Sequence, residues 1–70
     1  MRRDQAIEIA DNIASNVDAV KRGIFTADEE EIVVAMTRQL MDGFITVAPR
    51  YGIDAIALLN EAADRYAQGR

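Results

Sequence analysis

The fold is decided by residues 31 to 49, EIVVAMTRQLMDGFITVAP, which contain the longest apolar region of the chain. At 100° per residue, one line of apolar side chains runs along a helix here and a second line runs beside it. These lines comprise Val33, Met36, Leu40, Phe44 and Val47, and then Val34, Met41, Ile45 and Ala48. Together they cover about 220° of the helix circumference. One neighbouring helix cannot cover so wide an arc, so this segment is predicted to lie at the centre of the structure.

Sequence signals mark both ends of this central helix. Thr26 followed by Glu29 forms a capping box, and further acidic residues occupy the first turn, where the helix dipole is positive. Pro49 cannot continue the helical hydrogen bonds and restricts the residue before it. We therefore predict a helix over about 27–48. Gly43 leaves an alternative open, in which a shorter helix ends there and the segment after it is extended.

The acidic run TADEEE at residues 26 to 31 also has a functional interpretation. Its carboxylates would suit a metal ion or a surface that mimics nucleic acid. Capping accounts for both the position and the sign of these charges, so the run requires no ligand.

Two further segments have helical periodicity. Over about 4–22, apolar residues recur at spacings of four and three, and Gly23 can take the left-handed conformation that ends a helix. That stripe comprises Ala6, Ile9, Ala10, Ile13, Val17 and Val20. Over about 54–67, the stripe comprises Ile53, Ile56, Leu59, Ala63, Tyr66 and Ala67, widened by Ala55, Leu58 and Ala62. The chain is thus predicted to be all-α, with three amphipathic helices forming a small bundle in a single domain, residues 1–70.

Composition excludes several classes of protein. A chain of 70 residues is near the size at which one core barely offsets chain entropy. It has no cysteine and no histidine, so disulfides and the usual zinc and haem ligands are absent, and we predict no metal and no cofactor. The net charge of −4 is opposite to that of a general nucleic-acid binder. No signal peptide or membrane span is recognisable, which predicts a cytoplasmic protein without a membrane partner.

No group of residues suggests catalysis. The hydroxyl side chains have neither histidine nor cysteine to activate them, and no glycine-rich phosphate loop occurs. Arg38 with Asp42, and Glu61 with Arg65, are spaced four residues apart and fit surface ion pairs. We therefore predict that the protein is not an enzyme.

Residues 44–61 contain an alanine at 48, a glycine at 52 and flanking apolar residues, and in this spacing they resemble the helix-turn-helix proteins over about a quarter of the chain. The resemblance implies that the helix after Gly52 would read DNA. Asp54 and Glu61 stand where basic or amide side chains would be needed, and Pro49 interrupts the first helix of the motif. A nucleic-acid-associated transcriptional regulator with this degenerate motif is the alternative function, and it would use the bases Arg2, Arg3, Lys21, Arg22 and Arg50.

The main expectation follows from the excess of apolar surface. Three short helices are not expected to bury arcs of about 180° and 220° among themselves, so homodimerisation or a target protein should complete the fold. We predict a helical protein-interaction module, a regulator or inhibitor that binds a larger protein by occlusion; a structural subunit of an assembly would use the same surfaces. The net charge favours a basic patch on the target. The predicted interface comprises Met36, Leu40, Met41, Phe44, Ile45, Ile56, Leu59 and Tyr66.

Overall fold

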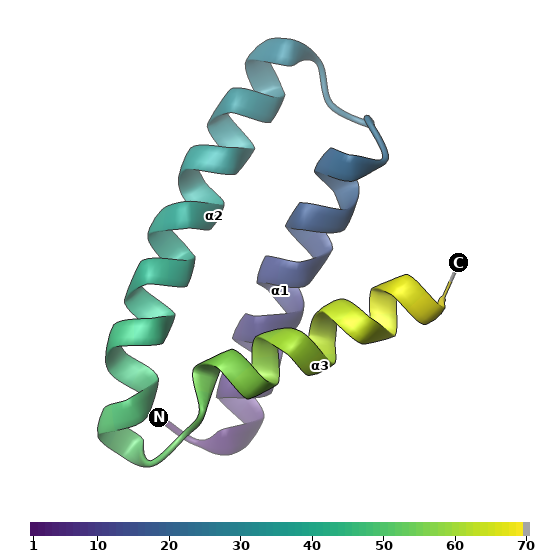
Figure 1. The fold of residues 1–70 in the computed structure, drawn as a ribbon. Coiled ribbons are helices and arrows are strands. Elements are labelled where there is room, and N and C mark those ends of the chain that lie inside the picture. The colour runs from purple at the N-terminus through teal and green to yellow at the C-terminus, as the bar shows by residue number, and fades with distance from the viewer. Residues whose placement is uncertain (70) are drawn as a thin grey trace.

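The computed structural model describes residues 1–69, which form three α-helices joined by short connections (Figure 1). Helix α1 spans Arg3–Lys21, α2 spans Ala27–Val47 and α3 spans Ala55–Gln68, with a single 3-10 turn, η1, over Ala48–Tyr51. No strand occurs in the part of the chain that is described. The all-α prediction is confirmed, and each helix end lies within one residue of its predicted position.

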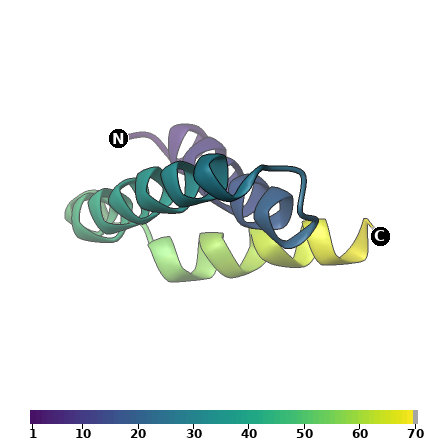
Figure 2. The same ribbon diagram turned by 90° about the horizontal axis from the view of Figure 1, so that it is seen from above.

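Helices α1 and α2 run in opposite directions as a hairpin, and α3 lies across one face of that hairpin as a second layer (Figures 1 and 2). Helix α3 packs mainly against α1 and much less against α2. The helix at the centre of the bundle is therefore α1, not α2 as predicted, and much of α2 is covered by a single neighbour. This arrangement is what leaves apolar surface of α2 open.

The core lies where α3 crosses the hairpin, and small side chains bring the helices close together. Ala6 and Ala10 of α1 and Ala62 of α3 are completely buried. Side chains this small allow neighbouring helix axes to approach to the short end of their usual range. The other members of the core are Ile13, Ala14, Phe44, Ala48, Ile53, Ala55 and Leu58.

The buried face of α2 follows the seam between its two predicted apolar lines. Thr37 lies on that seam and is buried, together with Phe44 and Ala48, the members of the two lines nearest to it. The Thr37 hydroxyl donates to the Val33 carbonyl at 2.7 Å and accepts from Asn16 Nδ2 of α1 at 3.3 Å. A polar side chain is tolerated in the core here because its hydroxyl has both partners. The remaining apolar residues of the two lines are half-buried or exposed.

The predicted centre of the apolar stripe on α3 is wrong. Ala55, Leu58 and Ala62, which were expected only to widen the stripe, form the buried face. Ile56 is 54 % exposed instead, and Ala63 is exposed as well. The reason lies in packing: α3 meets an alanine-rich face of α1, and two alanines on the buried face of α3 allow a closer contact than Ile56 would permit.

The connections match the expected turn chemistry. Gly23 and Gly52 both have a positive φ, at 69° and 72°, the left-handed conformation that glycine adopts without a steric cost. Asp54 caps α3, where its Oδ1 accepts from the Ala57 N–H at 3.1 Å. Helix α2 continues through Gly43 without a break, so the alternative of a shorter helix is not observed.

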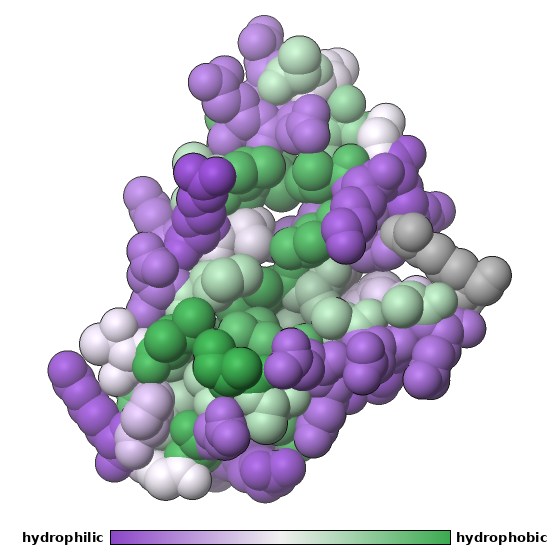
Figure 3. Space-filling model, in the orientation of Figure 1, coloured by the Kyte–Doolittle hydropathy of each residue, from purple (hydrophilic) through white to green (hydrophobic). Residues whose placement is uncertain are grey.

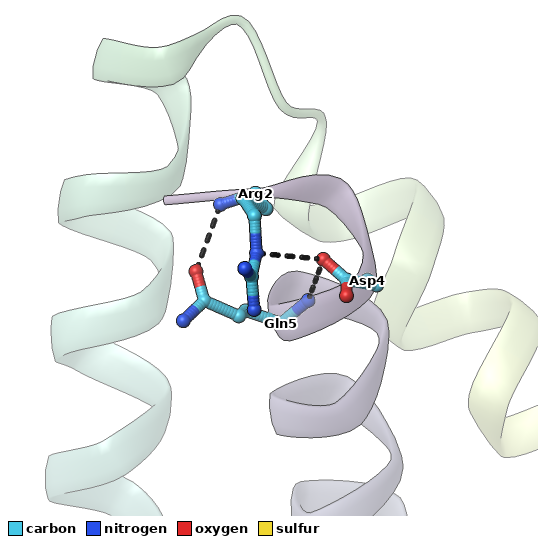
Figure 4. Close-up of polar contacts among 3 residues, drawn as sticks. All are labelled: Arg2, Asp4 and Gln5. Carbon is cyan, nitrogen blue, oxygen red and sulfur yellow. Dashed lines mark hydrogen bonds and ion pairs between the residues drawn. The ribbon is translucent and has the colours of Figure 1, made fainter.

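Helix α1 begins with a polar cluster of three residues (Figure 4). The Arg2 N–H donates to Gln5 Oε1 at 2.9 Å, and the Gln5 N–H donates to Asp4 Oδ1 at 3.0 Å. Arg2 Nε also lies 3.3 Å from Asp4 Oδ1, in an ion pair on an exposed surface. The charge of Arg2 is therefore already engaged within the chain.

The capping box at the start of α2 is present as predicted. The Thr26 N–H donates to Glu29 Oε1 at 2.9 Å, and the Glu29 N–H donates to the Thr26 hydroxyl at 3.3 Å. Hydrogen bonds with Thr26 hold the pKa of the Glu29 carboxyl below its ordinary value. The bond with the Thr26 backbone N–H has the larger effect, and the bond with the Thr26 side chain has the smaller one. Because the pKa of Glu29 is lowered in the folded state, its interaction with Thr26 stabilises the fold at pH values above the ordinary pKa of a glutamate. It is lost as the pH falls through the lowered, folded value.

Thr26→Ala is expected to lower the free energy of unfolding by about 1 kcal/mol, because the first turn of α2 loses a side-chain acceptor. Thermal unfolding followed by circular dichroism measures the change. Thr46→Ala is the matched control, because the Thr46 hydroxyl is exposed and donates only to the Asp42 carbonyl within the helix. Equal loss of stability in both variants would contradict a specific role for the cap.

Candidate protein interface

The eight predicted interface residues do not form one surface. Met36, Leu40, Ile45 and Ile56 are exposed, and Met41, Leu59 and Tyr66 are partly buried. Phe44 is only 3 % exposed and belongs to the core of the chain itself. Because the chain itself already buries it, Phe44 is not available to a partner.

The large apolar side chains of α2 that remain exposed lie mostly on one flank of the helix. Ile32 and Met36 are 61 % and 63 % exposed, and Leu40 is exposed beside them. Residues 1–69 therefore cover little of Ile32 and Met36 and only part of Leu40. The wide apolar arc predicted for α2 is therefore covered only in part by its own chain.

A hollow opens on the other flank of α2, between the three helices. It consists of two adjoining grooves of about 270 and 310 Å³, which share Val17, Lys21 and Met41. We call it the central hollow; its main apolar lining is Val17, Val20, Val34, Met41, Leu59 and Ala63. Figure 3 shows hydrophobic side chains around an opening at the centre of this face. All three helices contribute, so the hollow exists only in the folded chain.

Two cations stand at the edge of the central hollow. Lys21 and Arg38 are exposed and line the groove between α1 and α2. Neither forms an ion pair within residues 1–69, so the predicted Arg38–Asp42 pair is not formed. The groove between α1 and α2 is thus flanked by two cations although the chain as a whole carries a charge of −4, and Asp18 adds one carboxylate to the adjoining groove.

The wall formed by α3 is tied to α1 through Asp11. The Tyr66 hydroxyl donates to Asp11 Oδ2 at 3.3 Å, and Arg65 Nη2 lies 3.8 Å from Asp11 Oδ1. The Glu61–Arg65 pair predicted within α3 is absent from residues 1–69, because Arg65 turns to α1 instead. These contacts hold the C-terminal half of α3 against the hairpin. They also give Tyr66 a structural role beside its place in the lining of the hollow.

Several residues of this surface are not predicted from the sequence. Val17, Val20 and Val34 belong to predicted apolar stripes and were assigned to helix packing, whereas they line the central hollow. Lys21 is predicted from the sequence only as one of the bases of the nucleic-acid alternative, whereas it lines both grooves of the hollow. The periodicity shows which side of each helix is apolar, but the angle at which α3 crosses the hairpin decides which of those residues stay open.

Bases proposed for a DNA-reading function are mostly engaged elsewhere or dispersed. Arg2 pairs with Asp4, and Arg22 Nη1 lies 3.7 Å from Asp18 Oδ2 at the end of α1. Asp54 serves as the N-cap of the helix that would have to enter the groove. The structure therefore gathers no basic surface at the corner between α2 and α3 beyond Arg50 of η1.

Residues 1–69 contain neither a membrane-spanning helix nor a cluster of metal-binding side chains. No helix combines the length and the apolar character needed to cross a membrane, and no cluster of three or more acidic side chains has the geometry of a metal site. Comparison with protein-family models, curated proteins and solved structures returns no match to this chain. A proposal about the function of this chain therefore has to rest on the residues of its own surface.

Proposed function

We propose that this chain is a non-enzymatic protein-interaction module of the cytoplasm that takes an amphipathic helix of a larger protein into its central hollow. Binding would cover the apolar face of that helix and keep it from its other partners, which makes the chain a regulator or inhibitor acting by occlusion. The proposal rests on one observation: an open apolar hollow, built by three helices, with two unpaired cations at its rim.

The apolar part of the hollow sets the shape of the ligand. Grooves between helices accept the apolar face of a further helix, whose anchors recur at three and four residues. Met41 lies where the two grooves meet, and methionine adapts to irregular surfaces because its side chain is unbranched and polarizable. An amphipathic helix is therefore the segment that this surface fits.

The cations set the charge of the ligand. Lys21 and Arg38 have no carboxylate partner within residues 1–69, and the approach of an apolar helix would partly remove them from water. Acidic residues beside the apolar face of the target would compensate that loss. The net charge of the chain favours a basic patch on the target. At the central hollow, however, Lys21 and Arg38 favour a target segment with acidic residues, and we propose such a segment for this site.

Association with a second copy belongs to the same proposal. The central hollow accounts for one flank of α2 but leaves Ile32, Met36 and Leu40 on the other flank uncovered. A homodimer would cover these side chains while leaving the hollow open. The protein would then bind itself on one flank of α2 and its target on the other.

Charge reversal at the rim tests the target-binding function. The probes are two synthetic amphipathic helices with the same leucine face, one flanked by glutamates and the other by lysines. The unaltered chain is expected to bind the glutamate peptide about tenfold more tightly than the lysine peptide, because Lys21 and Arg38 flank the groove between α1 and α2. In Lys21→Glu with Arg38→Glu this preference should reverse. Isothermal titration gives the affinities, and NMR shifts of the Val17, Val34 and Met41 methyl groups locate the peptide.

The matched control is Arg2→Glu with Arg3→Glu, which changes the net charge equally but far from the hollow. It should leave the preference for the glutamate peptide in place, apart from a small general effect of net charge. If both double variants shift the affinities alike, the binding is non-specific. If neither peptide perturbs the methyl groups of the hollow, the proposed function is wrong.

A further inference from the structure

One flank of α2 carries an exposed apolar stripe that the central hollow does not explain. We call it the outer stripe; it comprises the exposed residues Ile32, Met36, Leu40 and Gly43 and ends at the half-buried Val47. At 100° per residue, all of them fall within about 80° of the helix circumference. A groove beside its C-terminal half is lined by Leu40, Gly43 and Val47 and continues onto Ile9 and Met1. The surface is therefore apolar over about 22 Å of helix length.

Gly43 is the unusual member of the outer stripe. Glycine inside a helix costs about 1 kcal/mol relative to alanine, so its presence needs a reason. A Cβ placed on Gly43 would meet nothing within 4 Å, and its φ is not in the left-handed region. Neither packing nor backbone conformation within the chain requires glycine at this position. A gap in the stripe does, however, let another helix approach closely there.

The outer stripe is nearly symmetric about a point between Gln39 and Leu40. Ile32 and Val47 lie equally far from that point, and so do Met36 and Gly43. When two such helices pair in opposite directions about this point, Met36 of each copy faces Gly43 of the other. The most exposed side chain of the stripe then meets the one position that has no side chain. This is the knob-and-hole relation by which packed helices interlock.

The charges at the two ends of α2 favour the same direction. Four acidic residues, Asp28 to Glu31, crowd its N-terminal end, and Arg50 lies just beyond its C-terminal end. An antiparallel pair brings Arg50 of one copy toward the acidic first turn of α2 in the other. Arg50 forms no ion pair within residues 1–69. A parallel pair would instead bring eight carboxylates together, which like-charge repulsion opposes.

We infer that two copies of this chain pair through the outer stripes of α2, antiparallel, with Met36 of each copy seated over Gly43 of the other. The inference rests on the self-association included in the proposed function and specifies its surface, direction and register. It does not involve the central hollow, which lies on the other flank of α2. The two ideas can therefore fail separately.

Cysteine cross-linking tests direction and register, since the chain has no cysteine of its own. Gln39→Cys should form a covalent dimer on mild oxidation, because it lies beside the symmetry axis. Met36→Cys and Gly43→Cys should each remain mostly monomeric alone and cross-link to each other when mixed. Ala35→Cys, on the same helix but outside the stripe, is the control and should not cross-link. Self-linking of Met36→Cys without linking to Gly43→Cys would indicate a parallel pair and overturn the inference.

Gly43→Leu provides a second test with a result that loss of folding cannot imitate. Filling the gap should raise the dimer dissociation constant about tenfold or more by sedimentation equilibrium. At concentrations where the chain is monomeric, the melting temperature should rise or stay unchanged, because leucine favours the helix and has open space. Unaltered association in this variant, or a strict monomer for the original chain at high micromolar concentration, would overturn the inference. The peptide-binding preference at the rim should persist in Gly43→Leu, which separates this test from that of the proposed function.

Discussion

Phe44→Ala is expected to lower the free energy of unfolding by about 3–5 kcal/mol. Phe44 is 3 % exposed and is the largest side chain in the core, which otherwise consists mainly of alanine, isoleucine and leucine. Its removal would leave a cavity that small neighbours cannot fill. A domain of 70 residues has a total stability of about 4–10 kcal/mol, so this single change should leave much of the population unfolded. Urea denaturation followed by circular dichroism measures the effect.

Met36→Ala is the matched control for Phe44→Ala, because both residues lie on α2 and Met36 is 63 % exposed. Measured at a concentration where the chain is monomeric, its effect should stay within about 0.5 kcal/mol. At high concentration Met36→Ala should lose stability if the outer stripe pairs as inferred. A loss at Met36 equal to that at Phe44 under monomeric conditions would show that the buried face of α2 has been misassigned.

Leu58→Ala is expected to cost about 2–5 kcal/mol, the second-largest effect. Leu58 is 3 % exposed and lies between the fully or nearly fully buried Ala55 and Ala62 on the face of α3 that meets the hairpin. It is the only large side chain on that buried face of α3. Its loss should therefore release α3 before the hairpin melts. Hydrogen exchange of the α3 amides, compared with those of α1, distinguishes local release from global unfolding.

Ile56→Ala should have a much smaller effect, within about 0.5 kcal/mol, because Ile56 is 54 % exposed. The two residues share a helix, are two positions apart and have side chains of equal size. The sequence periodicity alone assigns Ile56 to the main stripe and Leu58 to its margin. Greater destabilisation from Ile56→Ala than from Leu58→Ala would favour that assignment over the packing described here.

The sequence was sufficient to predict the helices because their ends depend on local interactions. The capping box of Thr26 and Glu29, the left-handed glycine at 23 and the proline at 49 each act within a few residues of their position. The continuity of α2 through Gly43 was predicted from apolar spacing on both sides of the glycine. Signals of this kind need no knowledge of how the helices pack.

The sequence was not sufficient to predict which apolar residues stay open. The choice between Leu58 and Ile56 depends on the angle at which α3 crosses α1, and that angle depends on alanines far apart in the chain, such as Ala10 and Ala62. The predicted interface therefore included a core residue, Phe44, and missed the valines of the central hollow. Arg65 likewise pairs across helices with Asp11, where a local rule expected a pair within α3.

The central hollow and the outer stripe occupy opposite flanks of α2, and this separation has a consequence for affinity. A pair joined through the stripes, as inferred above, would carry two open hollows and would be bivalent. Once one hollow has captured a segment of a target, a second segment on a short tether is presented to the other hollow at an effective concentration in the millimolar range. Avidity can then exceed the affinity of a single hollow by about 10²–10⁴. Tight capture would begin only above the concentration at which the chains pair, so the abundance of this small protein would set a threshold for its own activity.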